Sequence, residues 1–269
     1  MKSNFHTHTT FCDGKNTPSE MAARAFESGF DALGFSGHSF TDFDPCGMSP
    51  LSAARYRAET ARLKERYAGR MEIYCGVEQD YFSGKTPPEY EYAIGSVHYL
   101  LHDGEYLCVD WSPERTRENI AKYGGDRYAY AEAYFELAGR VLEATGADIV
   151  GHFDLVSKFD EREALLDENH PRYRRAALSA LESLCAGGKR PVFEINTGAM
   201  ARGYRSAPYP SEWILREIRA RGCPVMITSD CHDRDLLEFG YDAAAAAARR
   251  AGFLSQITIK GGVFTEIGL

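Results

Sequence analysis

Short apolar segments that end at or just before a histidine or a carboxylate recur along this chain, and they limit the fold more than any other feature of the sequence. Seven such segments are found: the residues before His6, and residues 31–36, 71–78, 92–98, 147–152, 191–196 and 224–230. Their length and apolar content predict buried strands. Sequence with helical signals lies between most of them, so the alternation predicts parallel β/α units.

The helical signals are caps, prolines and amphipathic stripes. Thr17-Pro18-Ser19-Glu20 supplies an N-cap, a proline at the first helical position and an acid at the third, so a helix should begin there and end at Ser28. Residues 126–145 are predicted to form one long amphipathic helix. Other helices are expected at 50–69, from 113, and at 171–186, 210–221 and 241–251, with an irregular or hairpin insertion at 100–111 and extended pieces at 256–260 and 263–267.

Ionisable residues gather at the carboxyl ends of the predicted strands. Six of the eight histidines do so, and three carboxylates join them. The set is His6, His8, His38, Glu78, His98, His152, Glu194, Asp230 and His232. In a β/α barrel these ends converge on one face, where catalytic residues are found. A buried strand that ends in an ionisable group must desolvate that group or use it, so the repeated pattern has no packing explanation.

Imidazoles and carboxylates without thiolates form a ligand set that suits Zn, Mn or Fe ions. His6 and His8 are one residue apart at the end of a short strand, so they lie on the same face and can chelate one ion. Asp13 follows on a turn that Gly14 permits, and it can add an oxygen ligand to a neighbouring ion. Because the candidates outnumber the ligands of a single ion, we expect two to three divalent metal ions.

Length, composition and charge bound the remaining classes of function. With 44% hydrophobic content, residues 1–269 are expected to form a single barrel-sized domain. No apolar run is long enough to span a membrane, and seven scattered cysteines indicate reduced thiols, so we expect a cytoplasmic protein without a membrane partner. The net charge of -8 argues against a nucleic-acid partner. We expect a monomer or a weak homo-oligomer.

The ligand candidates stand in ordered motifs. These are His6-x-His8, an isolated His38, Glu78 in Gly-Val-Glu-Gln-Asp-Tyr, His98 in Gly-Ser-Val-His, His152 in Gly-His-Phe-Asp-Leu, and Asp230-Cys-His232. In this order they resemble the motifs of the PHP (polymerase and histidinol phosphatase) superfamily. The contexts His-Thr-His-Thr-Thr-Phe-Cys-Asp-Gly, Glu-Ile-Asn-Thr-Gly and Thr-Ser-Asp-Cys-His-Asp are similar to those of its histidinol-phosphatase branch.

This resemblance implies a distorted, TIM-like (β/α)7 barrel with a three-metal site. One ion would be held by His6, His8, Glu78 and Asp230, a second by Glu78, His98 and His152, and a third by Asp13, His38 and His232. A carboxylate can bridge two ions through its two oxygens, which agrees with Glu78 as the bridge. The expected catalytic residues are Glu78, Asp230 and His232. Asp13 departs from the histidine that many relatives have at its position.

Clustered divalent ions can bind the oxygens of a phosphate monoester, convert a bound water to metal-bound hydroxide and steady the leaving alkoxide. We therefore predict a hydrolase that acts on a small phosphorylated substrate. Phosphoryl transfer needs mostly positioning and charge neutralisation, so Cys12 and Cys231 are expected to pack rather than react. The branch resemblance implies a histidinol-phosphatase, which converts L-histidinol phosphate and water to L-histidinol and phosphate in histidine biosynthesis.

Three alternatives stay open. A phosphotyrosine-protein phosphatase of the superfamily would show an Asp-Asp-Gly type of first motif, where this chain has Cys12-Asp13-Gly14. A phosphoesterase acting on nucleotides, oligonucleotides or other small phosphate esters would use nearly the same ligands. A metal-binding regulatory module without turnover is the third alternative, although no ligand position is degraded.

Cations beyond the ligand motifs are candidates for binding the substrate phosphate. The family interpretation puts Lys158, Arg202 and Arg205 in this role, with Arg202 outside the metal site on the loop after the sixth strand. Asp42 and Asp44 follow His38 and are guesses, from charge alone, for binding the imidazole and the amine.

Two carboxylates could act on the ligands without binding metal. For Glu194, orientation of a ligand and a polar contact in the barrel interior are both open interpretations. Asp233 is a candidate for the first of these roles.

Overall fold

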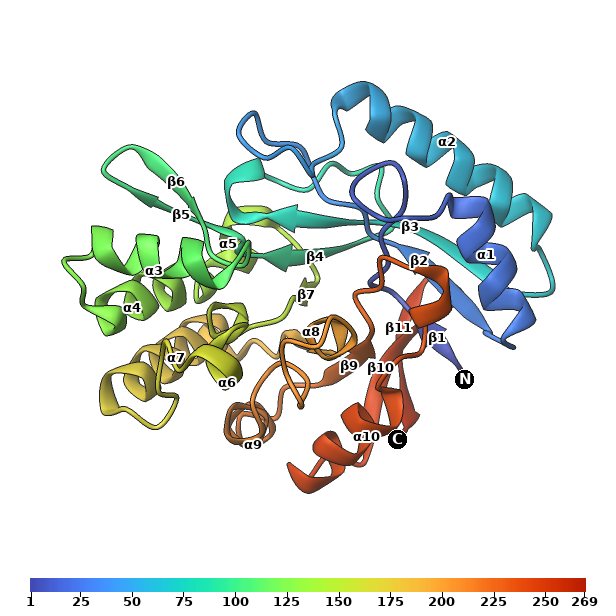
Figure 1. Ribbon diagram of the computed structural model, residues 1–269. Helices are drawn as coiled ribbons and strands as arrows, with labels where there is room; N and C mark the ends of the chain where they lie inside the picture. Colours follow the sequence, from blue (N-terminus) through green and yellow to red (C-terminus); the bar gives the residue numbers. More distant parts are fainter.

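A parallel sheet of seven strands organises the computed structural model, which describes residues 1–269 (Figure 1). The strand order is β1-β2-β3-β4-β7-β8-β9, and every neighbouring pair in it is parallel. Beyond the two edge strands, Thr7 and Cys231 form a parallel bridge, and the His8 amide donates to the Cys231 carbonyl at 2.9 Å. The sheet therefore curls into a nearly closed barrel, as the alternation of strands and helices predicts. The strands are β1 Ser3–Asn4, β2 Ala32–Phe35, β3 Glu72–Asp80, β4 Tyr92–Ser96, β7 Ile149–Val150, β8 Val192–Asn196 and β9 Val225–Thr228.

Helices surround the sheet on its outer side (Figure 1). The first begins as its sequence predicts: the Thr17 amide donates to the Glu20 carboxylate at 2.8 Å, and the Glu20 amide donates to the Thr17 hydroxyl at 3.3 Å. None of the helices is both long and apolar enough to cross a membrane. The helices are α1 Pro18–Glu27, α2 Pro50–Arg66, α3 Pro113–Lys122, α4 Arg127–Ala138, α5 Val141–Thr145, α6 Asp160–Glu163, α7 Pro171–Leu184, α8 Gly198–Ala201, α9 Glu212–Ala220 and α10 Tyr241–Arg250.

The long helix predicted over residues 126–145 is wrong in one respect, because it is broken into α4 and α5 at Gly139 and Arg140. Gly139 packs closely on α7, and a Cβ atom there would lie 2.9 Å from the Cα of Ala180. Glycine is also a poor helix former. The amphipathic stripe continues across the break, so the pattern alone does not reveal it.

Two antiparallel hairpins extend the barrel. The insertion after β4 forms β5 (Tyr99–His102) and β6 (Glu105–Cys108), whose turn places Asp103 and Gly104 at positive φ, as two-residue hairpin turns require. This hairpin projects from one side of the molecule in Figure 1. The C-terminal pieces pair as β10 (Ser255–Lys260) and β11 (Val263–Gly268).

The interior of the barrel is filled by a cluster of apolar side chains at its amino-terminal end. Tyr92 occupies the middle, so a Cβ at Gly34 or at Gly76 would lie within 2.4 Å of its ring or hydroxyl. The C-terminal hairpin closes this end through Ile259. The cluster comprises Phe5, Ala32, Tyr74, Tyr92, Ile94, Ile149, Met226 and Ile259. The opposite, carboxyl-terminal end is thereby left for polar residues.

Candidate metal centre

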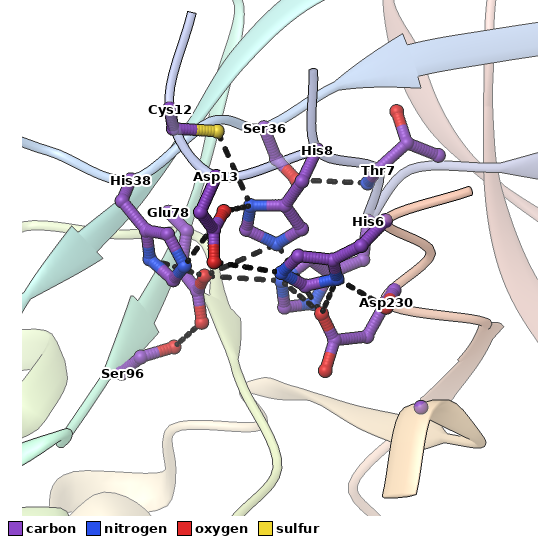
Figure 2. Close-up of polar contacts among 12 residues, drawn as sticks. His6, Thr7, His8, Cys12, Asp13, Ser36, His38, Glu78, Ser96 and Asp230 are labelled. Atoms are coloured by element: carbon purple, nitrogen blue, oxygen red, sulfur yellow. Dashed lines mark hydrogen bonds and ion pairs between the residues drawn. The ribbon is translucent and has the colours of Figure 1, made fainter. Parts of the chain in front are cut away.

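One buried carboxylate, Glu78 near the carboxyl end of β3, lies at the centre of the polar end of the barrel (Figure 2). Five histidine rings approach its two oxygens. Around Oε2 lie the Nδ1 of His38 at 3.0 Å and the Nε2 atoms of His6 at 3.2 Å and His8 at 3.5 Å. Around Oε1 lie the Nε2 atoms of His152 at 2.9 Å and His98 at 3.2 Å. The two oxygens thus face two different sets of ligand atoms, as a bridging carboxylate would.

Asp230, after β9, is the second carboxylate of the centre. Its Oδ1 lies 3.2 Å from the Nε2 of His8, 3.6 Å from the Nε2 of His6 and 3.7 Å from the Nδ1 of His232. The residue has a φ of 48°, which is uncommon outside glycine and costs backbone strain. A Cβ at Gly198 would lie 2.6 Å from Asp230 Oδ2, so the loop after β8 can pack here only with a glycine.

Asp13 brings a third carboxylate from the N-terminal loop. Its oxygens lie 3.1 Å from His232 Nε2, 3.5 Å from His8 Nδ1 and 3.6 Å from His38 Nε2. The loop turns back tightly on itself, because a Cβ at Gly14 would lie 2.4 to 2.6 Å from the backbone of residues 8 and 9. Gly14 therefore has the role that the sequence suggests, which is to return Asp13 over the histidines.

The nine expected ligands come together, but their grouping differs from the expected three sets. Three groups have ligand atoms that all lie within 4.8 Å of one another: His8, Asp13, His38 and His232; His6, His8 and Asp230; and His38, Glu78 and His98. Relative to the expected partition, Glu78 is absent from the first group, His38 takes the place of His152 in the second, and His8 joins the third. His8 lies near three carboxylates, Asp13, Glu78 and Asp230, and His38 lies near Asp13 and Glu78, so each ring can face more than one position.

The carboxylates and histidines of the centre stabilise one another's charges. Burial raises the pKa of Glu78, but the surrounding histidines, led by His6, outweigh it and hold that pKa well below its usual range. Burial lowers the pKa of His6, yet the nearby carboxylates, led by Glu194, raise it well above its ordinary value. Burial and two neighbouring histidines lower the pKa of His8 to about 3.

Several ligand atoms have no hydrogen-bond partner although they are buried. The Nε2 atoms of His6 and His8 and the Oε2 of Glu78 are in this state. Buried polar atoms are normally satisfied, so three of them directed toward one another require an explanation. Imidazole nitrogens and carboxylate oxygens at such spacings fit the coordination of Zn, Mn or Fe.

A supporting carboxylate that sequence analysis missed is Asp80. Its Oδ2 lies 3.3 Å from the Nδ1 of His98 and accepts the His98 amide at 3.1 Å. The signal was present, because residues two apart on a strand point to the same side and Asp80 follows Glu78 by two. Asp233, by contrast, is directed to Lys15 and to the Asp235 amide rather than to the ring of a ligand.

A cavity of about 330 Å³ opens from the ligand cluster. Lys158 lines it and is held by Asp110, which sequence analysis also missed, through contacts of 2.8 Å to the carbonyl and 2.9 Å to the carboxylate. Asp44 lines it as well, whereas Asp42 is not among the lining residues. Trp111 stands at the wall with 63% of its surface exposed.

The two arginine candidates differ in position. Arg202 lines the cavity and belongs to none of the ligand groups, but it contacts two ligand candidates, Asp230 Oδ2 at 2.9 Å and His232 Nδ1 at 3.2 Å. Its short α8 loop brings it back onto the end of β9. Arg205 is not a lining residue, because its guanidinium donates to Ser157 at 2.6 Å and to Ser211 at 3.3 Å.

Comparison with known families agrees with this arrangement. The family model described as PHP domain matches residues 4–198, which is most of the chain. The chain belongs to the PHP domain family. This PHP chain is 29% identical over 264 residues to the histidinol-phosphatase of Bacillus subtilis (strain 168), with 88% of this chain and 96% of the relative covered.

Two solved structures share the fold of the PHP chain. A protein of Listeria monocytogenes superposes with a TM-score of 0.76 at 22% identity, with 90% of this chain and 99% of that chain covered. Histidinol phosphate phosphatase from Lactococcus lactis, solved with Zn, L-histidinol and phosphate, superposes with a TM-score of 0.69 at 17% identity and 98% coverage of both chains. The barrel of this PHP chain is therefore the distorted TIM-like barrel that its motifs imply.

Proposed function

We propose that this protein is a metal-dependent phosphomonoesterase that hydrolyses L-histidinol phosphate to L-histidinol and phosphate. The observation that supports the proposal is a cluster of nine ligand candidates, seven of which line one cavity together with two cations, Lys158 and Arg202. The Bacillus subtilis relative, which aligns over 88% of this chain, supports the choice of substrate. The reaction would serve histidine biosynthesis in the cytoplasm, with residues 1–269 acting as one domain.

The metal ions, two to three Zn, Mn or Fe, would be held by the nine residues expected from the sequence. Divalent ions bound here would lower the pKa of a coordinated water toward about 7 and neutralise charge on the phosphate oxygens. Glu78 would bridge two of them, because its two oxygens face different histidines. These nine residues are His6, His8, Asp13, His38, Glu78, His98, His152, Asp230 and His232.

The phosphate end of the substrate would be bound by Lys158 and Arg202. A guanidinium presents a planar fork of donors that matches two phosphate oxygens, and the lysine adds a point charge. Asp110 fixes the lysine, because both its carbonyl and its carboxylate accept from Nζ. The proposed catalytic residues are Glu78, Asp230 and His232. Arg202 contacts Asp230 and so connects this group to the phosphate-binding side. Arg205 would support this side through Ser157 rather than touch the substrate.

The other end of the substrate carries a primary amine and an imidazole. The cavity offers the carboxylate of Asp44 and the exposed ring of Trp111 on the side formed by the loop after His38 and the β5–β6 hairpin. We propose that Asp44 pairs with the ammonium and that Trp111 packs against the imidazole. Cations on one wall and a carboxylate on another match a substrate with opposite charges at its two ends.

A panel of phosphate esters tests the proposed function. L-Histidinol phosphate should be hydrolysed with a kcat/KM at least about 100-fold above that of AMP, phosphotyrosine and 4-nitrophenyl phosphate, because only it can use remote binding energy. Treatment with a chelator should abolish turnover, and elemental analysis should find two to three ions per chain. Better turnover of AMP or of phosphotyrosine would favour the nucleotide or protein phosphatase instead, and activity that survives chelation would reject the metal centre.

A further inference from the structure

Glu194, in the middle of β8, is a wholly buried carboxylate that belongs to none of the three ligand groups. It accepts four hydrogen bonds. Its Oε1 lies 2.5 Å from the Nδ1 of His6 and 2.5 Å from the Thr228 hydroxyl. Its Oε2 accepts from the His152 amide at 2.8 Å and from the Asn196 side chain at 3.0 Å. Every one of these partners is buried, so solvent does not share in the arrangement.

The contacts of Glu194 determine which nitrogen of His6 carries the proton. An ionised carboxylate only accepts hydrogen bonds, so the Nδ1 of His6 must be the donor. In the neutral ring the lone pair then lies on Nε2, the atom that faces Glu78 Oε2 at 3.2 Å and Asp230 Oδ1 at 3.6 Å and has no hydrogen-bond partner. The other tautomer would place a lone pair against the carboxylate at 2.5 Å.

The same carboxylate joins opposite parts of the ligand cluster. His6 follows β1, which lies at one edge of the sheet, whereas His152 follows β7 and Thr228 ends β9. The barrel closes by bridges between the segments after β1 and β9, and Glu194 adds side-chain bonds across that seam. Both the ring of His6 and the backbone of His152 are thereby positioned by one residue.

We infer that Glu194 is a positioning residue that holds His6 in the tautomer and orientation required to bind a divalent ion. This rests on the proposed function in one point, which is that His6 is a metal ligand. Carboxylates that accept from the free ring nitrogen of a ligating histidine typically contribute 10-fold to 100-fold to metal affinity. Glu194 thus acts through His6 and His152 and does not touch the substrate.

The test compares Glu194→Gln with the unaltered protein in two measurements, one of which needs no metal. In the metal-free protein, the 15N shifts of the His6 ring, assigned by their loss in His6→Gln and followed to a pH at which the ring is neutral, report the tautomer. Glutamine keeps the shape of the side chain but replaces one of its two oxygens with an NH2 group, which would then face hydrogen-bond donors. We therefore expect the Nδ1-H form of His6 to become less populated. Zinc affinity, measured by competition with a chromophoric chelator, should fall by about 10-fold to 100-fold.

Two further variants keep the result interpretable. Asp154→Asn is the matched control, because Asp154 is also fully buried and near His152 but bonds Ser211 instead of a ligand ring. It should leave the His6 shifts and zinc affinity unchanged. If Glu194→Gln does not fold, Glu194→Asp retains the charge, withdraws it by one methylene, and should reduce zinc affinity by a smaller factor.

Unchanged His6 shifts together with unaltered zinc affinity in the Glu194 variant would overturn the inference and leave only an interior polar contact. A failure of the proposed function looks different. In that case the unaltered protein would bind no zinc or hydrolyse no phosphate ester, while the ring shifts of the metal-free protein would still show whether Glu194 sets the His6 tautomer.

Discussion

The two halves of the barrel interior are made by the same strands but differ in chemistry. On β3, Tyr74 lies in the apolar half and Glu78 in the polar half; on β9, Met226 and the following Asp230 show the same change over four residues. Side chains four apart on a strand point to one side, so these two strands each lead from an apolar residue below to a ligand candidate above. The apolar half holds the strands at fixed spacing, and this spacing brings the polar groups together.

The comparison separates stability from chemistry. Changes in the polar half should alter metal binding and turnover while the fold persists, and changes in the apolar half should alter stability while the ligands stay in place. Four experiments test this division, beginning with the largest expected effect.

Glu78→Ala should be the most damaging single change to activity. Because both oxygens of Glu78 face histidines, its loss disturbs two ion positions, and we expect kcat/KM to fall by about 1000-fold or more, which is about 4 kcal/mol. Metal content should fall with it, as measured by elemental analysis, while the circular dichroism spectrum stays unchanged. Glu72→Ala, on the same strand and away from the ligands, is the control. Full activity and full metal content in Glu78→Ala would contradict the bridge.

Ile259→Ala probes the apolar half from the C-terminal hairpin. Ile259 is 3% exposed and packs inside the amino-terminal end of the barrel, so its truncation should cost about 3 kcal/mol of unfolding free energy. Urea unfolding measures this cost, and the folded fraction should bind metal as before. Val263→Ala, on the next strand of the hairpin but 63% exposed, should change stability by less than about 0.5 kcal/mol. Loss of metal affinity without loss of stability would break the division.

Lys158→Met addresses the boundary between the polar half and the cavity. Removing the cation should raise KM for L-histidinol phosphate by about 10-fold to 30-fold with a smaller effect on kcat, if the contact is equal in ground and transition states. Steady-state kinetics measure the split, and metal content should stay constant. Lys158→Arg retains the charge and the contact to Asp110, so it should keep most of the activity. An unchanged KM in Lys158→Met would remove the lysine from the phosphate site.

The sequence predicts the elements of this fold well because each depends on local signals. The Thr17 to Glu20 cap and the apolar strands need no tertiary information, and the position of the ligands at strand ends follows from the barrel rule. The break at Gly139 was missed because it depends on contact with Ala180, which is 41 residues away.

The features of the site that the sequence does not predict also depend on contacts between residues distant in the chain. Asp110 and Arg202 are placed by loops, and nothing in the local sequence reveals that one fixes Lys158 or that the other folds back onto Asp230. The grouping of His8 and His38 among several carboxylates depends on distances set by several strands at once. Local patterns therefore identify the ligand candidates, while only tertiary structure shows which atoms meet.

The smallest expected effect concerns Asp160, a carboxyl that is screened from solvent but has no histidines around it. It can therefore be compared with Glu78, which is buried among histidines. Burial raises the pKa of Asp160 from 3.8 to about 7, whereas the histidines lower the pKa of Glu78. A raised pKa in the folded state means that the contribution of Asp160 to stability is complete below pH 4 and is lost as the pH rises through 7. Asp160→Asn mimics the protonated form and keeps an oxygen for the Leu166 amide, so its advantage over the unaltered protein should grow by about 1 to 2 kcal/mol between pH 5 and pH 8. Urea unfolding of both proteins at several pH values measures this difference. If the unfolding free energies of the two proteins changed with pH in the same way, Asp160 would be buried as an anion without histidines. The proposed contrast with Glu78 would then be wrong.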